Sequence, residues 1–409
     1  MKLEIDSIRL TSELAKLATF SDAPAPAVTR VVFSEQDRHA RAYCLGLYEE
    51  AGLQVREDAV GNVFARWVGA EPDLPAIGTG SHIDAIPHSG QYDGTVGVLG
   101  GLEAIRALQR SGMRPRRSIE LMMFSAEEPT RFGIGCFGSR MLAGVLDGTT
   151  LRDKDGKSLE EWRTMAGFIG EFSTVALPVG YYAGFVELHI EQGPHLEKDG
   201  IPIGVVTAIA APSSLRIFVE GEGGHAGAVL MPGRRDAFCA AAEIVLAVET
   251  AARSTGAIDT VGTVGVCDVF PGAVNGVPSR VRLEVDVRDI DAGRRDGVLS
   301  QIDKACQEVA VKRSVTVRTE VVNADLPTVC DARLVETVTK AAEAQGLACQ
   351  KMVSRAYHDT LFMSRITPAT MIFIPCRAGV SHRPDEYATP EAIAAGTRVL
   401  AGSLAALAM

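Results

Sequence analysis

Three short apolar runs in the first half of the chain each end in polar residues: AIGTGSHID (76–84), SIELMMFSAEE (118–128) and FVELHIEQG (185–193). A segment with helical periodicity, GTVGVLGGLEAIRALQRSG (94–112), separates the first two runs. Buried strands that alternate with helices predict a largely parallel sheet with helices on its faces. Because ligands of such sheets bind at the carboxyl ends of the strands, the three polar ends predict a binding site.

A different pattern begins at about residue 213, where the sequence predicts strands and helices in the order β-α-β-β-α-β. This is the order of the ferredoxin-like fold. Helix–strand alternation then resumes and continues through a closing helix. The expected fold is therefore α/β: a discontinuous domain, residues 1–211 and 327–409, into which a smaller α+β domain, residues 212–326, is inserted.

Composition and charge agree with a cytoplasmic protein of two domains. A chain of 409 residues is too long for one ordinary core. Its net charge of −10 argues against a nucleic-acid partner, and it has no run of 18 apolar residues, so we expect no membrane span. The first residues, MKLEIDSIRLTSELAKLA, lack the pattern of a signal peptide. The eight cysteines are scattered, which favours free thiols over disulfides.

Four short motifs carry imidazoles and carboxylates. They are SHIDAIPHSGQYDG with His82, Asp84 and Asp93, FSAEEPTRFG with Glu127 and Glu128, ELHIEQG with His189, and GVSHRPDEY with His382. Such a set without thiolates suits zinc, manganese or a similar divalent ion. Adjacent glutamates alone more often form a solvated turn. At a strand end, however, their side chains diverge, so one can bind a metal while the other binds the attacking water.

The order His-x-Asp, Asp, Glu-Glu, His and a late His resembles the metallopeptidase M20 family. The segments ELHIEQGP, IGVVTAI, GGHAG, NGVPSR and GVSH are similar to its hydantoinase/carbamoylase branch. That branch includes N-carbamoyl-L-amino acid hydrolases, β-ureidopropionases, allantoate amidohydrolases and ureidoglycolate amidohydrolases. The segments 19–31, 225–237 and 354–376 most resemble the ureidoglycolate amidohydrolases.

The resemblance implies two divalent metal ions, zinc or manganese, that share one carboxylate. One ion would be bound by His82, Asp93 and His189. The other would be bound by Asp93, Glu128 and His382, with Asp93 as the bridge.

The resemblance also implies the residues that act on the substrate. Glu127 would be the general base, and Asp84 would orient His82 through its second ring nitrogen. His225, in GEGGHAGAV, resembles a histidine that reaches the scissile carbonyl across a dimer. A lone histidine in a glycine-rich loop would usually lie at the surface, but this motif favours the catalytic interpretation.

Four further residues resemble substrate contacts of the branch. Asn275 and Arg288 would hold the substrate carboxylate, for which a guanidinium is well shaped. Gln192 would contact the ureido end, and His358 would lie near the substrate.

The predicted activity is hydrolysis of a ureido (N-carbamoyl) group on a small carboxylate substrate by a homodimer, with release of ammonia and carbon dioxide. Arg355 and Tyr357 replace small residues of the branch, which favours a small substrate such as ureidoglycolate. An N-carbamoyl-L-amino acid or allantoate is the alternative. A peptidase of the same fold and a non-catalytic binding protein are remoter interpretations. All predicted ligands and the base are present, which argues against the latter.

Overall fold

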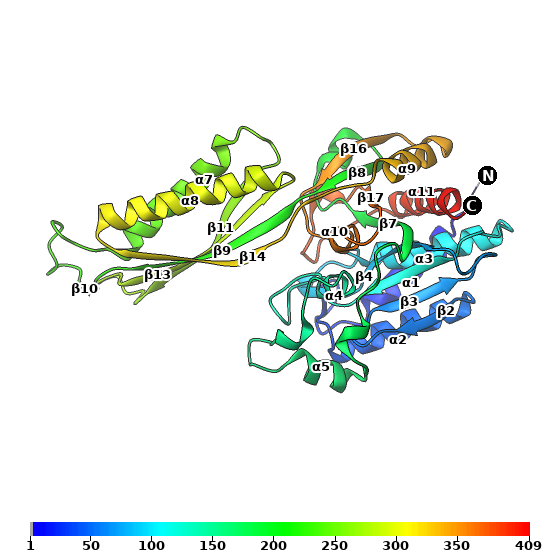
Figure 1. Ribbon diagram of the computed structural model, residues 1–409, viewed down its shortest axis with the longest axis horizontal. Coiled ribbons are helices and arrows are strands. Elements are labelled where there is room, and N and C mark those ends of the chain that lie inside the picture. The colour runs from blue at the N-terminus through cyan, green and yellow to red at the C-terminus, as the bar shows by residue number, and fades with distance from the viewer. Residues whose placement is uncertain (1–2) are drawn as a thin grey trace. The chain divides into compact units, whose positions relative to one another are not determined.

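The computed structural model describes residues 3–409 (Figure 1). The chain divides into two compact units, which we call unit 1 and unit 2. Unit 1 comprises the residues up to Thr207, together with 330–354 and 358–409. Unit 2 comprises residues 208–329 and the short segment 355–357.

The segment 355–357 is part of unit 2 although the sequence pattern places it in the larger domain. Its side chains explain this placement, because both bind residues of the inserted region. Arg355 forms an ion pair with Asp259, and the Tyr357 hydroxyl donates a hydrogen bond to Asp325. The other divisions between the units fall after Thr207 and after Val329.

The sheet of unit 1 has a parallel centre, so the α/β prediction is confirmed. Its four parallel strands lie in the order β17 (Ala369–Ile374), β7 (Tyr182–Ile190), β4 (Ala76–His82) and β6 (Ile119–Phe124). Antiparallel neighbours flank this centre: β8 (Ile203–Ile209) beyond β17, then β3 (Val63–Trp67) and β2 (Gln54–Glu57) beyond β6. Further short strands are β16 (Cys349–Ser354), which pairs with β8, and the pair β1 (Val28–Arg30) and β5 (Ala85–Ser89).

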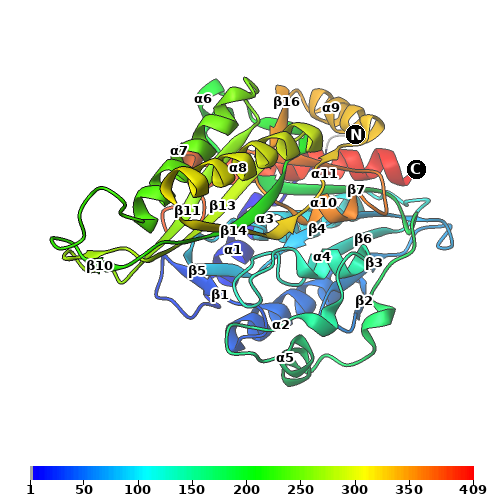
Figure 2. The same ribbon diagram turned by 60° about the vertical axis from the view of Figure 1, so that its left-hand side comes forward.

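Helices cover both faces of this sheet (Figure 2). Helix α3 (Thr95–Arg110) lies close against β4 and β7, and Gly97 permits this approach. A Cβ atom at Gly97 would lie 2.4 Å from the Leu188 carbonyl oxygen. An aromatic cluster with Phe124 and Phe185 fills the other face. The other helices of unit 1 are α1 (Ser7–Ala18), α2 (Glu35–Glu50), α4 (Phe137–Leu142), α5 (Leu159–Ala166), α6 (His195–Asp199), α9 (Ala332–Ala344), α10 (Asp359–Met363) and α11 (Pro390–Ala408).

Helix α11 is the one described helix long and apolar enough to cross a membrane by length and composition. Most of it (61%) is buried inside the structure, where it packs against α3 and α9. It begins after Thr389, whose hydroxyl caps the helix by accepting a hydrogen bond from the Ala392 amide. These features are those of a core helix. The cytoplasmic location stays a prediction.

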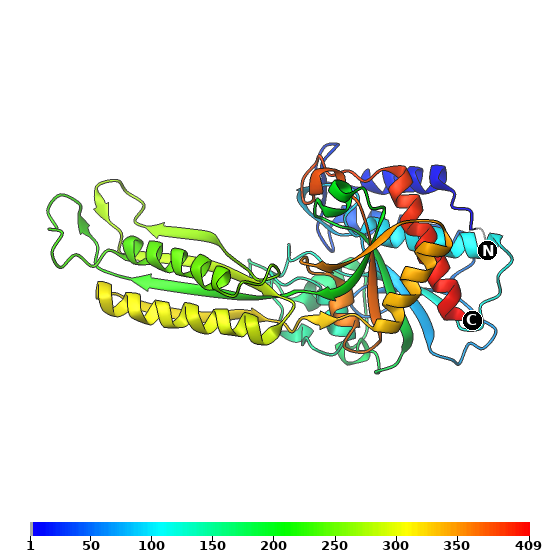
Figure 3. The ribbon, with the colours of Figure 1, turned by 90° about the horizontal axis from the view of Figure 1, so that it is seen from above.

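Unit 2 has the order β-α-β-β-α-β. Its elements are β9 (Ala211–Glu220), α7 (Ala237–Ser254), β11 (Val261–Phe270), β13 (Arg280–Asp289), α8 (Ala292–Arg313) and β14 (Thr316–Ala324). The strands form an antiparallel sheet in the order β11-β13-β9-β14. Alternate residues of β13 are buried, which is the period expected when helices cover one face. Figure 3 shows α7 and α8 side by side over that face.

Short strands extend unit 2 beyond its main sheet. β10 (Gly224–His225) pairs with β12 (Gly276–Val277), and these follow β9 and precede β13 along the chain. At the opposite end of the sheet, β15 (Thr328–Val329) pairs with the last residues of β8.

Candidate active site

The polar ends of β4, β6 and β7 lie at one edge of the unit 1 sheet. His82 ends β4 and pairs in register with Phe124, the last residue of β6. Glu127 and Glu128 lie in the turn after that strand, separated from its end by two residues, while His189 is the penultimate residue of β7. Because these strands are parallel neighbours, their carboxyl ends bring the four side chains to the same place.

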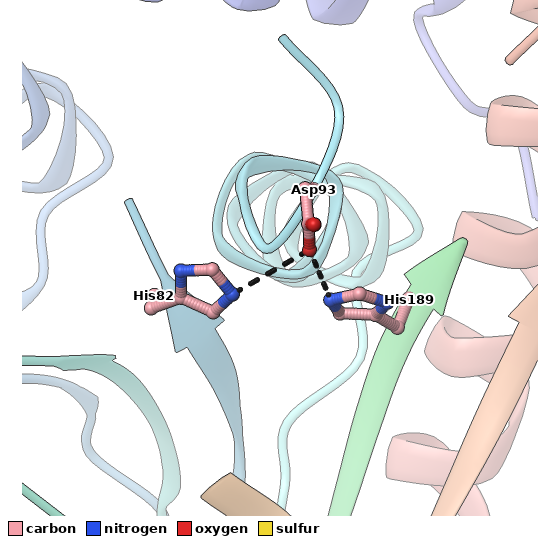
Figure 4. A group of neighbouring side chains, drawn as sticks. All are labelled: His82, Asp93 and His189. Atoms are coloured by element: carbon pink, nitrogen blue, oxygen red, sulfur yellow. Dashed lines mark ion pairs between the residues drawn. The ribbon is translucent and has the colours of Figure 1, made fainter. Parts of the chain in front are cut away.

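Asp93 lies at the centre of this edge, in the loop before α3 (Figure 4). Its Oδ1 atom is 3.7 Å from His82 Nε2 and 3.0 Å from His189 Nε2. Its Oδ2 atom is 3.1 Å from His382 Nε2, which is also 3.4 Å from Glu128 Oε1. The two oxygens of one carboxylate therefore face two different groups of side chains, as a bridging metal ligand requires.

The main chain fixes how the two buried imidazoles point. His82 Nδ1 lies 3.1 Å from the Asp84 carbonyl oxygen, and His189 Nδ1 lies 2.8 Å from the Ile190 carbonyl oxygen. A carbonyl only accepts, so each Nδ1 donates its hydrogen. Each Nε2 consequently faces Asp93, where it can bind a proton or a metal ion.

Electrostatics at this edge favour a bound cation. Burial lowers the pKa of His82, but hydrogen bonds to Asp84 and Asp93 raise it well above its ordinary value. Burial also lowers the pKa of His189, but the hydrogen bond to Asp93 and the charge of Asp93 oppose burial, and overall the pKa is raised. A hydrogen bond to Asp93 likewise raises the pKa of His382. The Asp93 carboxylate therefore favours positive charge, from protons or from a cation, between itself and the three imidazoles.

One buried oxygen of Glu128, Oε1, has no hydrogen-bond partner among the described residues, although His382 Nε2 lies 3.4 Å from it. Burial first, and then the charges of Glu127 and Asp93, raise the pKa of Glu128 well above its usual range. A buried carboxylate oxygen without a donor is costly, and a divalent cation between Asp93, Glu128 and His382 would remove that cost.

The residues therefore fit two divalent ions. His82, Asp93 and His189 offer ligand atoms within 4.8 Å of one another, and so do Asp93, Glu128 and His382. Glu187, His189 and His358 form a third such group, but its carboxylate is already occupied. Glu187 accepts hydrogen bonds from the Ser81 hydroxyl and the Thr360 amide and hydroxyl.

Asp84 makes contacts beyond the expected one with His82. Its Oδ1 is 3.5 Å from His82 Nδ1, farther than its own carbonyl oxygen. The same carboxylate accepts hydrogen bonds from the main-chain amides of Glu127 at 3.1 Å and Glu128 at 3.0 Å. Asp84 thus joins the loop after β4 to the turn after β6.

Glu127 differs from Glu128 in its surroundings. Its Oε2 is 3.8 Å from His82 Nε2, and its Oε1 accepts a hydrogen bond from the Cys136 thiol at 3.3 Å. Burial raises the pKa of Glu127 to about 7, with the charge of His82 opposing the shift and that of Asp93 adding to it. A carboxyl group with such a pKa can both take and return a proton near neutral pH.

Two further residues, which the sequence reasoning missed, hold Asp93. Glu386 Oε1 accepts hydrogen bonds from the main-chain amides of Tyr92 at 2.8 Å and Asp93 at 3.1 Å. The Ser381 hydroxyl lies 3.0 Å from Asp93 Oδ2 and 2.8 Å from Glu386 Oε2. Both residues belong to the GVSHRPDEY motif, and the signal for Ser381 is its place directly before His382. The sequence does not show that Glu386 is buried.

Two predicted substrate contacts lie beside the ligand group in this structure. Gln192 Nε2 donates to Asp93 Oδ2 at 2.8 Å, and its Oε1 is buried with no hydrogen-bond partner among the described residues. His358 is 1% exposed, and its ring centre lies 4.5 Å from that of His189. The free amide oxygen of Gln192 is the atom left to meet a substrate donor.

Unit 2 brings His225 and Asn275 together. His225 pairs with Gly276 across β10 and β12, and the Ala226 amide donates to the Asn275 carbonyl oxygen at 2.8 Å. The Gly227 amide donates to His225 Nδ1 at 3.2 Å. In the neutral ring this leaves the hydrogen on Nε2, which can donate to a substrate oxygen.

Arg288 lies at the opposite end of the unit 2 sheet. It is eight positions along β13 from Arg280, the end of the strand nearest β12, which corresponds to about 26 Å of extended strand. Its guanidinium is held by Asp286 at 2.7 Å and by the Arg355 carbonyl oxygen at 3.2 Å. Asn275 and Arg288 of one chain are therefore too far apart to bind the same small carboxylate, and their role as substrate contacts stays a prediction.

Comparison with known proteins identifies the family. A sequence profile of the peptidase family M20/M25/M40 matches residues 78–406. The chain belongs to this family. Among M20 relatives, it is 51% identical to a ureidoglycolate hydrolase of Arabidopsis thaliana over 100% of this chain and 88% of the relative. It is 38% identical to an N-carbamoyl-L-amino acid amidohydrolase of Geobacillus stearothermophilus over 97% of each.

A solved structure agrees with this assignment over almost the whole chain. The crystal structure of AtUAH in complex with glyoxylate is 51% identical and superposes with a TM-score of 0.91, covering 99% of this chain and 98% of that one. The M20 fold is thus shared along with the sequence.

Proposed function

We propose that this protein is a metal-dependent ureidoglycolate amidohydrolase, which hydrolyses the ureido group of a small carboxylate. The observation that carries the chemistry is the bridging position of Asp93, with one carboxylate oxygen toward each group of ligands and Glu127 beside them. The substrate class is supported by the 51% identity to the Arabidopsis ureidoglycolate hydrolase along the entire chain.

Zinc or manganese would be held by His82, Asp93 and His189 in one position and by Asp93, Glu128 and His382 in the other. The two ions would supply Lewis-acid polarisation of the ureido carbonyl and a lowered pKa for water. The orphaned oxygen of Glu128 and the main-chain anchors of both buried imidazoles support this assignment.

Glu127 is the proton carrier in this proposal. Its carboxylate takes a proton from the attacking water as the water oxygen bonds to the ureido carbon. It then delivers that proton to the leaving nitrogen as the carbon–nitrogen bond breaks.

The products follow from the substrate. Hydrolysis of ureidoglycolate at the carbamoyl carbon gives carbamate and hydroxyglycine. Carbamate decomposes to ammonia and carbon dioxide, and hydroxyglycine, which carries a hydroxyl and an amino group on one carbon, eliminates ammonia to give glyoxylate. Two ammonia molecules per substrate are therefore expected, against one for an N-carbamoyl amino acid.

The active protein is proposed to be a homodimer in which two chains complete each site. Arg288 would bind the substrate carboxylate, and His225 would donate a hydrogen bond from Nε2 to the ureido carbonyl oxygen. These two groups of ureidoglycolate are only a few bonds apart. His225 and Arg288 of a single unit 2 lie at opposite ends of its sheet, so the two residues would come from different chains.

The substrate assignment is tested by ammonia release with the metal-supplemented protein. Ureidoglycolate, allantoate, β-ureidopropionate and N-carbamoyl-L-amino acids should be compared at equal concentration, with dipeptides as a test for the peptidase alternative. The proposal requires the highest kcat/KM for ureidoglycolate. A higher value for an N-carbamoyl-L-amino acid would assign the protein to that alternative class instead.

A further inference from the structure

The turn that carries Glu127 is paired with the start of α4. The amides of the residue before α4 and of the first two residues of α4 donate hydrogen bonds to three successive carbonyl oxygens of that turn. The pairs are Cys136 to Glu127 at 2.7 Å, Phe137 to Ala126 at 3.0 Å and Gly138 to Ser125 at 2.9 Å. Gly138 permits the contact, because a Cβ there would lie 2.5 Å from the Ser125 oxygen. The main chain therefore fixes Cys136 next to Glu127.

The side chain of Cys136 points at the carboxylate rather than away from it. Cys136 is fully buried and has a left-handed backbone conformation, with φ of 56°, which an L-residue adopts only when its surroundings hold it there. In that conformation its Sγ lies 3.3 Å from Glu127 Oε1. The second oxygen, Oε2, is the one that faces His82.

Glu128 lacks such a partner. Its Oε1 is buried and makes no hydrogen bond within residues 3–409, with His382 Nε2 3.4 Å away, whereas the corresponding oxygen of Glu127 accepts a hydrogen bond from the thiol. The Oε1 atoms of the two adjacent glutamates therefore differ, because only that of Glu127 accepts a hydrogen bond. Glu128 is left open for a cation, and Glu127 is tied to the protein by one of its oxygens.

We infer that Cys136 is a positioning residue for the reaction: its thiol holds Oε1 of Glu127 so that Oε2 faces the attacking water. This inference rests on the proposed role of Glu127 as the base. A thiol suits the task because it is a weak donor. It restricts the rotation of a flexible carboxylate, as a preorganised base requires, without binding the carboxylate as firmly as a charged donor would.

The test compares two substitutions of equal size. Ala and Ser have similar volumes, but only Ser retains a donor, and both are L-residues in the same left-handed conformation. Cys136→Ala should lower kcat for ureidoglycolate by about threefold to tenfold, the range of one hydrogen bond, with KM and bound metal unchanged. Cys136→Ser should retain most of the wild-type kcat.

Two controls make each outcome decisive. Cys44→Ala removes another fully buried thiol, on α2, and should leave kcat unchanged. Thermal unfolding confirms that each variant is folded, and Cys136→Gly, which also lacks a donor and suits the left-handed backbone, replaces the Ala variant if the latter is not. Equal kcat for the Ala and Ser variants, whether wild-type or reduced, would overturn the inference, as would a change confined to KM.

Failure of the underlying proposal has a different result. If Glu127→Gln kept the wild-type kcat, the role of Glu127 as the base would be wrong, and Cys136 would have nothing to position. If Glu127→Gln were impaired while Cys136→Ala was not, only the role of the thiol would be wrong.

Discussion

One edge of the unit 1 sheet brings its predicted site residues together, whereas the unit 2 sheet keeps two of its predicted site residues apart. At the edge of unit 1, residues separated by up to 300 positions converge, so that His82 and His382 both approach Asp93. In unit 2, Asn275 and Arg288 are only 13 positions apart in sequence, yet a whole strand separates them. Parallel strands gather their ends at one edge, whereas an antiparallel strand carries the chain from one end of its sheet to the other.

The two units therefore contribute different parts of the proposed reaction. The proposed metal and base chemistry is complete within one unit 1. The proposed substrate binding by His225, Asn275 and Arg288 would be incomplete within one unit 2, because no single small molecule reaches both ends of the sheet. The comparison predicts that changes in unit 1 abolish the chemistry of their own chain, while changes in unit 2 can be compensated by another chain.

Metal removal should have the largest effect. Chelation should reduce ammonia release to the uncatalysed rate, and an added divalent ion should restore it. Asp93→Ala should lose both ions, because its two oxygens face both ligand groups. Metal content measured by atomic emission checks this, and full turnover by metal-free protein would contradict the account.

The two adjacent glutamates should respond differently to the same substitution. Glu127→Gln should lower kcat by about 10²–10⁴, the range for a positioned base, with metal content intact. Glu128→Gln should lower metal content, because Gln offers a neutral ligand where the structure has an unpartnered carboxylate oxygen. The reverse pattern in kcat and bound metal would exchange the two assignments.

His225→Ala should lower kcat by about 10²–10³, the range for loss of one donor to a developing oxyanion. Bound metal should be unchanged, since His225 lies in unit 2 and the proposed ligands lie in unit 1. Gln in place of His225 offers a matched variant with an N–H donor and should recover part of kcat. Loss of metal in either variant would place His225 among the ligands.

Arg288→Lys should mainly raise KM, by about tenfold to hundredfold, because an ammonium cannot reproduce a two-point contact to a carboxylate. Arg282→Lys is the control on the same strand, since Arg282 pairs with Asp268 at the surface. It should leave KM unchanged. Equal effects of the two substitutions would move the carboxylate site away from Arg288.

Sequence patterns predicted the strands whose ends carry polar motifs, because a buried parallel strand is an apolar run and its end is abrupt. Hence His82, Glu128 and His189 could be grouped before the structure was known. Their metal binding stays a prediction. The sequence pattern did not predict the distance between Asn275 and Arg288, since spacing along a chain does not state which end of an antiparallel strand a residue occupies.

The hydrogen-bonding partners of the site were also beyond sequence reasoning. Cys136 contacts Glu127 because the chain between them, nine positions long, turns back on itself, and Glu386 contacts the Asp93 amide from 293 positions away. A cysteine between glycines in sequence, as in GIGCFGS, is typical of many loops. Only its left-handed backbone and the 3.3 Å contact distinguish it.

The most direct test of the shared site mixes two inactive variants. His225→Ala and Glu127→Gln chains are combined, subunit exchange is confirmed by mass spectrometry with differently tagged chains, and ammonia release is measured. If His225 serves the neighbouring chain, one site of each heterodimer contains an intact Glu127 and an intact His225. A statistical mixture should then recover about one quarter of wild-type activity. If both residues serve the same chain, every site lacks one of them, and confirmed exchange without recovery would contradict the account.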